Sequence, residues 1–288
     1  MKRGALTILI SVAALIMAAS VCRPVAQAVN WRSQPVDNLR SGFIEPQTTT
    51  GDELSEEFHQ TYPLNATGRV SLENVNGNVH ISVWDQNEVK VDAIKRAYQR
   101  ERLDEVRIEV NTTADSVRIR TSYPDRDQTF NDQEPRRYNN PASVEYSLTV
   151  PRKARLESVE LVNGSLEIEG VEGDVKAASV NGHLTARGLA GEVKLSTVNG
   201  GVEAVIARLD ESKPVSLNSV NGSIVLTIPP DANAQIRANT VHGKITNDFG
   251  LPVNDGEYVG HDLNGQIGSG GPRIRLSNVN GSITIKRG

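Results

Sequence analysis

Apolar and polar residues alternate along the chain from Leu54 onward, and this period of two is typical of half-buried β-strands. It is clear at residues 79–83, and it recurs at 106–110 and 117–120, where it predicts a strand pair joined by a turn. Residues 97–105 favour one or two helical turns. The pattern therefore predicts an all-β protein with little helix.

In the second half, glycine recurs every nine residues, at Gly164, Gly173, Gly182, Gly191 and Gly200. Every second one follows Val-Asn, so the full repeat is 18 residues long and consists of two unlike halves. Seven such tripeptides, some separated by insertions, occur up to residue 281, if the variants Val-His-Gly at 241–243 and Leu-Asn-Gly at 263–265 are counted. Periods of about 20–50 residues indicate stacked units that bury a continuous core between them.

The residues two and four positions after each glycine are aliphatic or alanine and share one strand face. The seventh position is apolar too but has the opposite parity, so the chain must bend before it, near Gly170 and Gly188. This reasoning places four residues inside: Val171, Val180, Leu189 and Val198. We therefore expect Val180→Asp to bury a charge, and Lys176→Asp to be nearly neutral.

The Asn-Gly pairs are expected to be the structural corners of the repeat, since both residues tolerate a positive φ. The asparagines and the hydroxyls before them (Ser179, Thr197, Ser219) are expected to stack from one repeat to the next. The predicted corner residues are Asn76, Gly77, Asn163, Gly164, Asn181, Gly182, Asn199, Gly200, Asn221, Gly222, His242, Gly243, Asn264, Gly265, Asn280 and Gly281.

These features predict a single-stranded β-helix, or β-solenoid, with coils of 18–22 residues. A meander of hairpins would place its turns in a similar way. A narrow core of Val, Leu and Ala can enclose itself, whereas a flat meander needs a second layer to cover it. The solenoid is therefore the preferred fold.

The N-terminus predicts export. Residues 1–28 have a positive start, a long uncharged stretch and an Ala26-Gln27-Ala28 cleavage site, which are the marks of a signal peptide. An uncleaved anchor, or a lipoprotein modified at Cys22, are the alternatives. Polar residues 29–53 are interpreted as a flexible leader. The solenoid domain spans 54–288, with a mobile loop at 123–141.

The sequence resembles the bacterial putative-adhesin family, an exported domain of unknown function. The resemblance rests on the Val-Asn-Gly repeats, on Trp84-Asp85 and Val150-Pro151, and on the terminal Asn-Gly-Ser-Ile-Thr-Ile at 280–285. It covers roughly Glu56 to Gly288. It implies a right-handed, single-stranded β-helix, and it brings no catalytic residues.

The charge of the chain argues against a nucleic-acid partner. The full sequence has 31 basic and 35 acidic residues, a net charge of −4. Cleavage after Ala28 would remove Lys2, Arg3 and Arg23 and leave 28 basic residues against 35 acidic ones. Nucleic-acid binding needs a clustered basic face. No other long apolar run occurs, so no membrane span is expected after cleavage.

Candidate chemistry is sparse. The five histidines (His59, His80, His183, His242 and His261) have no metal-ligand spacing, and they are interpreted as corner or surface residues. Four carboxylates gather on outward positions: Glu167, Glu169, Glu172 and Asp174. A glycosidase could use a pair of them, but Phe, Tyr and Trp are all absent between Leu148 and Asp248. Neither a metal nor another cofactor is predicted.

The sequence therefore predicts an exported, non-catalytic repeat protein, periplasmic, surface-bound or secreted. Its role would be to bind or scaffold an unidentified protein or polysaccharide of the cell envelope, as an adhesin does. One alternative is a polysaccharide-active β-helix enzyme. Another is a regulatory partner in an envelope-stress response.

Overall fold

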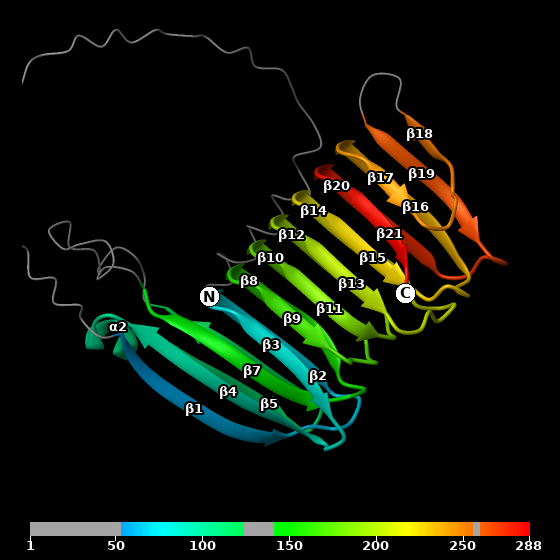
Figure 1. The fold of residues 1–288 in the computed structure, drawn as a ribbon. Coiled ribbons are helices and arrows are strands. Elements are labelled where there is room, and N and C mark those ends of the chain that lie inside the picture. Colours follow the sequence, from blue (N-terminus) through cyan, green and yellow to red (C-terminus); the bar gives the residue numbers. More distant parts are fainter. Residues whose placement is uncertain (1–52, 124–140, 256–259) are drawn as a thin grey trace, which may run out of the picture. The chain divides into compact units, whose positions relative to one another are not determined.

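The computed structural model describes residues 53–123, 141–255 and 260–288, which lie in one compact unit spanning 52–288. The expected signal peptide (1–28), nearly all of the leader (29–53) and nearly all of the loop at 123–141 fall outside the described residues. Within them the chain forms two long β-sheets and one short helix, α2 (Arg100–Glu105) (Figure 1). None of the described helices is long and apolar enough to cross a bilayer.

Sheet A has ten strands. In spatial order they are β1 (Leu54–Pro63), β4 (Glu88–Ala97), β7 (Ser143–Pro151), β3 (Val79–Trp84), β9 (Leu166–Glu169), β11 (Leu184–Leu189), β13 (Val202–Ile206), β15 (Ile224–Ile228), β21 (Ile283–Arg287) and β17 (Ile245–Asn247).

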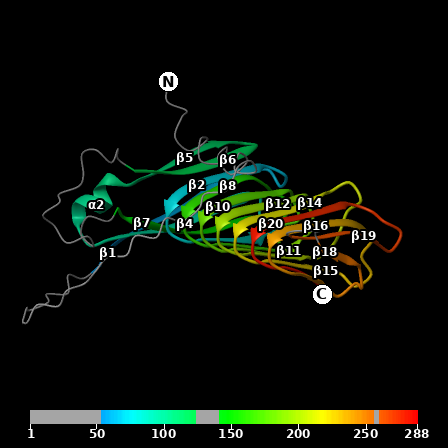
Figure 2. The same cartoon turned by 90° about the horizontal axis from the view of Figure 1, so that it is seen from above.

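Sheet B has eleven strands. In the same direction they are β5 (Arg107–Thr113), β6 (Ser116–Ser122), β2 (Arg69–Asn76), β8 (Arg155–Asn163), β10 (Val175–Asn181), β12 (Val193–Asn199), β14 (Val215–Asn221), β20 (Arg273–Asn280), β16 (Ala234–His242), β19 (His261–Ile267) and β18 (Val253–Asp255). Figure 2 shows this succession along the stack.

Each rung of the stack consists of one strand from sheet B and the next strand of the chain, which lies in sheet A. In the rungs that begin with β2, β8, β10, β12, β14 and β20 the chain passes between them at an Asn-Gly corner, and in the β16–β17 rung it does so at His242-Gly243. Successive rungs pair in parallel, so that Asn181 lies opposite Asn163 and Asn199 lies opposite Asn181, each 18 residues apart. The next step, to Asn221, takes 22 residues. The all-β, solenoid-like prediction is confirmed, and the right-handed sense of the coil stays a prediction.

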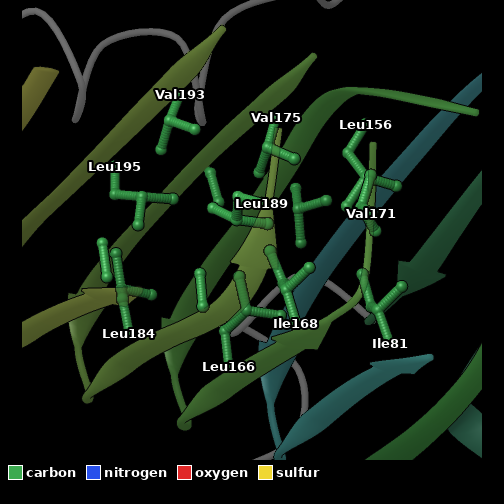
Figure 3. Close-up of a cluster of buried hydrophobic side chains, with 14 of the residues drawn as sticks. Ile81, Leu156, Leu166, Ile168, Val171, Val175, Leu184, Leu189, Val193 and Leu195 are labelled. Atoms are coloured by element: carbon green, nitrogen blue, oxygen red, sulfur yellow. The ribbon is translucent and has the colours of Figure 1, made fainter. Parts of the chain in front are cut away.

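The inner faces of the two sheets enclose a narrow aliphatic core. The positions two and four residues after the repeat glycines are all buried, from Leu166 and Ile168 to Val202 and Ala204. Figure 3 shows how Leu166, Leu184 and their neighbours fill the space between the sheets. Each buried Val, Leu or Ile stabilises the fold by roughly 1.5–3 kcal/mol, so stability accumulates rung by rung.

The expectation that the seventh residue after each repeat glycine points into the core is wrong in every second half-repeat. Val171 and Leu189 are fully buried, because Gly170 and Gly188 bend the chain at φ 73° and 71°. Val180 is only half-buried, and Ser179 is buried instead. No bend precedes the Asn-Gly corner, so every second residue from Val175 to Ser179 points inward. The same exchange places Thr197 inside and Val198 outside.

The rungs do not stack in sequence order, as a simple solenoid would require. The first rung (β2–β3) lies between the β6–β7 rung and the β8–β9 rung. The last rung (β20–β21) lies between the β14–β15 rung and the β16–β17 rung. In Figure 1, β3 accordingly separates β7 from β9, and β21 separates β15 from β17. The first and last rungs of the chain are thus interior rungs.

Antiparallel strands close both ends of the stack. At one end β4 pairs with β7, β1 with β4, and β5 with β6. The predicted strand pair at 106–120 is this β5–β6 hairpin, and the predicted helical turns form α2, which contacts β1 and β4. At the other end β19 pairs with β16, and β18 with β19. Such added strands protect the ladder edges of the repeats.

The prediction that Asn264-Gly265 is a corner is wrong. Both residues lie in the middle of β19, where Asn264 pairs with Arg237 and Gly265 with Ile236. The tripeptide is a chance match inside the capping strand. Gly265 has no left-handed φ, and a Cβ added there would lie 3.0 Å from the Leu251 side chain rather than against a neighbouring corner.

Candidate functional site

The corner asparagines form a continuous amide ladder along one edge of the stack. The Nδ2 of each donates to the Oδ1 of the asparagine in the rung before it, at 2.8–2.9 Å in all five steps. The ladder runs in the order Asn76, Asn163, Asn181, Asn199, Asn221 and Asn280. His242 lies opposite Asn280 in the last rung and has an exposed ring. These amides are engaged with each other, so their role is structural.

The corner glycines are required because successive backbones approach closely. A Cβ on Gly164 would overlap the carbonyl oxygen of Gly77, and one on Gly182 would overlap that of Gly164. The same holds for Gly200, Gly222, Gly243 and Gly281. Gly182 has no left-handed φ, so the close approach alone excludes a side chain there.

A second row of polar side chains lies inside each corner. Ser179 Oγ donates to the carbonyl of Gly164, and Thr197 Oγ1 to that of Gly182. Ser219 and Thr240 make the equivalent bonds, at 3.0 and 2.9 Å. In the two interior rungs Asn74 and Asn278 take this place. The predicted stacking hydroxyls thus satisfy corner carbonyls, and none is oriented by a base as a nucleophile would be.

Two of the carboxylates singled out in the sequence, Glu167 and Glu169, lie on β9 of sheet A, and Glu167 is engaged in ion pairs. Glu167 lies 3.4 Å from Arg187 and 3.3 Å from His80. Arg187 also holds Glu203, at 3.1 Å. Glu167, Arg187 and His80 line a shallow cleft of about 520 Å³ together with His183. Glu169 and Glu172 are exposed.

Asp174 lies apart from these carboxylates, at the turn that leads into β10. Partial burial opposes its ionisation, but hydrogen bonds from Lys213 Nζ (2.9 Å) and from the Glu192 N–H (3.0 Å) outweigh that effect. The pKa of Asp174 is therefore lowered. Because its carboxylate links consecutive rungs, Asp174 has a structural role.

The remaining histidines do not assemble into a site. His59 bonds Asp92 at 2.7 Å and Glu57 at 3.1 Å, and these bonds raise the pKa of its ring. His261 begins the capping strand β19. Within residues 53–123, 141–255 and 260–288, no three or more His, Cys, Asp or Glu side chains are grouped to hold a metal ion.

The outer face of sheet B presents three parallel rows, which sequence reasoning missed. The valine row holds the residue before each corner asparagine: Val75, Val162, Val180, Val198, Val220, Val279 and Val241. The polar row lies two residues earlier: Glu73, Glu160, Ala178, Ser196, Asn218, Ser277 and Asn239.

The third row, here called the cation row, lies two residues earlier again. It consists of Lys176, Lys194, Ser216, Arg275 and Arg237. All four cations are exposed. The ion pairs recorded on this sheet join Arg120 to Glu73 and Lys213 to Asp174. None of the four row cations forms one among the described residues.

Comparison with known families identifies the repeat region. The model of the family described as Toastrack DUF4097 matches residues 152–286, from just before β8 into β21. Residues 152–286 are a Toastrack domain. The Toastrack domain therefore contains the amide ladder from Asn163 onward and the whole cation row. The expected resemblance to the putative-adhesin family is confirmed. No curated protein matches the sequence.

Solved structures with a similar fold come from anaerobic bacteria. A "putative cell adhesion protein" from Clostridium sporogenes is 17% identical, with a TM-score of 0.45, covering 81% of this chain and 100% of that one. A "putative adhesin" from Bacteroides fragilis is 12% identical, with a TM-score of 0.35 and coverage of 81% and 97%. A "putative lipid binding protein" from Parabacteroides distasonis is 12% identical, with a TM-score of 0.31 and coverage of 81% and 96%. At these values the function of this chain must be argued from its own residues.

Proposed function

We propose that this chain is an exported, non-catalytic binding or scaffolding module of the bacterial cell envelope, built as a right-handed coil. One observation carries the proposal. The polar groups at the corners are engaged in structural hydrogen bonds, whereas the outer face of sheet B repeats a row of valines and carries exposed cations along the stack. A repeated, rigid face is suited to an extended partner.

The export signal in the sequence supports an envelope location, and the partner is expected to be a protein or polysaccharide found there. The competing function is that of a polysaccharide-active enzyme. Against it, Glu167 is engaged by Arg187 and His80. Glu167 and Glu169 also lie on an open sheet face rather than in an enclosed groove.

The test uses the purified mature chain and envelope fractions from its own cells. We expect saturable co-sedimentation with an envelope fraction, and export shown by fractionation of cells that produce the tagged full-length protein. Heat-unfolded protein serves as the control for non-specific adsorption. Failure to bind any envelope fraction, or retention in the cytoplasm, would contradict the proposal.

Catalysis is tested separately with a panel of polysaccharides. We expect no new reducing ends above the background set by the double variant Glu167→Gln, Glu169→Gln. Reproducible cleavage by the unaltered chain that this variant abolishes would replace the binding function with an enzymatic one.

A further inference from the structure

We propose that the outer face of sheet B binds a linear polysaccharide that carries carboxylates, with Arg237 and Arg275 as its anchor. The polymer would lie along the stack, over the polar row, between the cation row and the valine row. This inference rests on the proposed function, because it names the class of partner that the module would bind.

The first argument is electrostatic. Arg275 and Arg237 are direct neighbours on the parallel strands β20 and β16, and Lys176 and Lys194 are direct neighbours on β10 and β12. Neighbouring strands are about 4.8 Å apart. Like charges directly opposite each other destabilise a sheet. None of the four cations has an ion pair among the described residues to offset that cost, so an anionic ligand would relieve it.

The second argument is the cleft at the arginine pair. It has a volume of about 530 Å³ and is lined by Arg237, Arg275, Asn239, Asn264, Asp262 and Ser277, with Ala238 and Leu263 at its floor. A guanidinium group binds a carboxylate through two parallel hydrogen bonds. The amides and the hydroxyl add both donors and acceptors. The cleft therefore suits an anion that also carries hydroxyl groups.

Asp262 distinguishes among polyanions. Its carboxylate lines the same cleft, where it accepts a bond from Asn254 Nδ2 at 3.2 Å. A carboxylate accepts hydrogen bonds from sugar hydroxyls. A uronic-acid polymer supplies both a carboxylate for the arginines and hydroxyls for Asp262, whereas the backbone of DNA has no free hydroxyl group along its chain.

The other two rows fit the same ligand. Ala178, Ser196 and Ser277 in the polar row have small side chains, which leave room beside the valine row. Valine methyl groups can contact the C–H faces of sugar rings. Single-stranded nucleic acid would need aromatic platforms for its bases, and neither the polar row nor the two rows beside it contain an aromatic residue.

The experiment measures binding of the mature chain to polygalacturonate and to its methyl ester, which has the same backbone with the carboxylates blocked. We expect binding to the acid form alone, weakened by added salt. The double variant Arg237→Gln, Arg275→Gln should raise Kd at least about tenfold, since hydrogen bonds to charged groups are lost.

The matched control is Lys244→Gln, Lys286→Gln. It removes two exposed positive charges, one just before β17 and one from β21, but leaves the cation row intact. We expect its Kd to stay within about twofold of the unaltered chain, because only long-range attraction is lost. Equal melting temperatures would show that all variants are folded.

Several outcomes would overturn the inference. Equal weakening in both double variants, an unchanged Kd in the arginine variant, or equal binding of the methyl ester would show that the arginine pair is not the anchor. Equally tight binding of duplex DNA or anionic lipid vesicles would overturn the polysaccharide class. If envelope binding persists without polygalacturonate binding, only this inference fails; if both are absent, the proposed function fails as well.

Discussion

Just before an Asn-Gly corner, two adjacent residues of the strand point to opposite faces of sheet B. Ser179 is 4% exposed and donates to the carbonyl of Gly164, whereas Val180 faces outward into the valine row. The more polar of the two residues is the buried one. A corner carbonyl that would otherwise lack a second partner explains this inversion.

Substitution of Ser179 and of Val180 tests which of the two side chains points into the core. Ser179→Asp should lower the free energy of unfolding by about 3–5 kcal/mol, because it buries an unpaired charge. Val180→Asp should cost less than about 1.5 kcal/mol, because its side chain reaches water. Urea denaturation of both variants measures the difference. Equal losses, or a larger loss for Val180→Asp, would contradict the inward position of Ser179.

The corner glycines allow steric overlap to be separated from backbone strain. Gly182→Ala should destabilise the fold by about 1–3 kcal/mol, because its methyl group meets a backbone oxygen that cannot move freely. Gly250 is the reference, since it has φ 69° and no other atom lies within 4 Å of the position that a Cβ would occupy. Gly250→Ala should cost only the left-handed conformation, about 1 kcal/mol. Thermal melts that rank the two variants in the opposite order would show that the rungs separate easily.

At the scale of the element, the rung is a strand of sheet B, a corner and a strand of sheet A, and the ladder joins one rung to the next. Each internal asparagine donates to one neighbour and accepts from the other, so a chain of amides runs along the stack. Such chains of hydrogen bonds strengthen one another. The ladder thus aligns the rungs in register.

Asn199→Asp tests this role. The carboxylate keeps the acceptor for Asn221 but loses the donor to Asn181, so we expect a loss of about 0.5–1.5 kcal/mol in the free energy of unfolding. Asn218→Asp is the matched control, since Asn218 lies in the same sheet and makes only a 3.4 Å bond to Ser216. Chemical denaturation at neutral pH should show little change for the control. An equal loss in both variants would mean that the ladder contributes nothing of its own.

At the scale of the whole molecule, the first and last rungs of the described chain are inserted between other rungs of the stack. The β20–β21 rung pairs with β14–β15 on one side and β16–β17 on the other. The strands β16 to β19 therefore reach the rest of the stack through the last residues of the chain. The arginine pair of the cation row exists only because of this insertion, since Arg237 and Arg275 come from β16 and β20.

Truncation after Gly271 tests the inserted rung. Without β20 and β21, strands β16 to β19 lose their parallel partners, and we expect loss of amide protection across residues 234–267. The milder variant Leu276→Ala, in the core of β20, should cost about 2–5 kcal/mol. Hydrogen exchange measures both. Retained protection of β16 in the truncated chain would show that β16 can pair directly with β14.

The sequence by itself determined the local structure of this protein. Its period of two, its nine-residue glycine spacing and its Val-Asn-Gly tripeptides predicted the strands, the corners and the stacked asparagines. The physical reason is that a strand or a corner depends on residues within one half-repeat. Side-chain alternation and the need for glycine at a close approach are both readable at that distance.

Only the tertiary structure decided how the rungs are ordered and which residues share the outer face. Similar rungs fit beside one another almost equally well, so no local pattern shows that β20–β21 belongs between β14–β15 and β16–β17. For the same reason the sequence could not separate the true corner at Asn280 from the chance match at Asn264. The cation row also depends on this order, because pairing between distant strands brings its charges together.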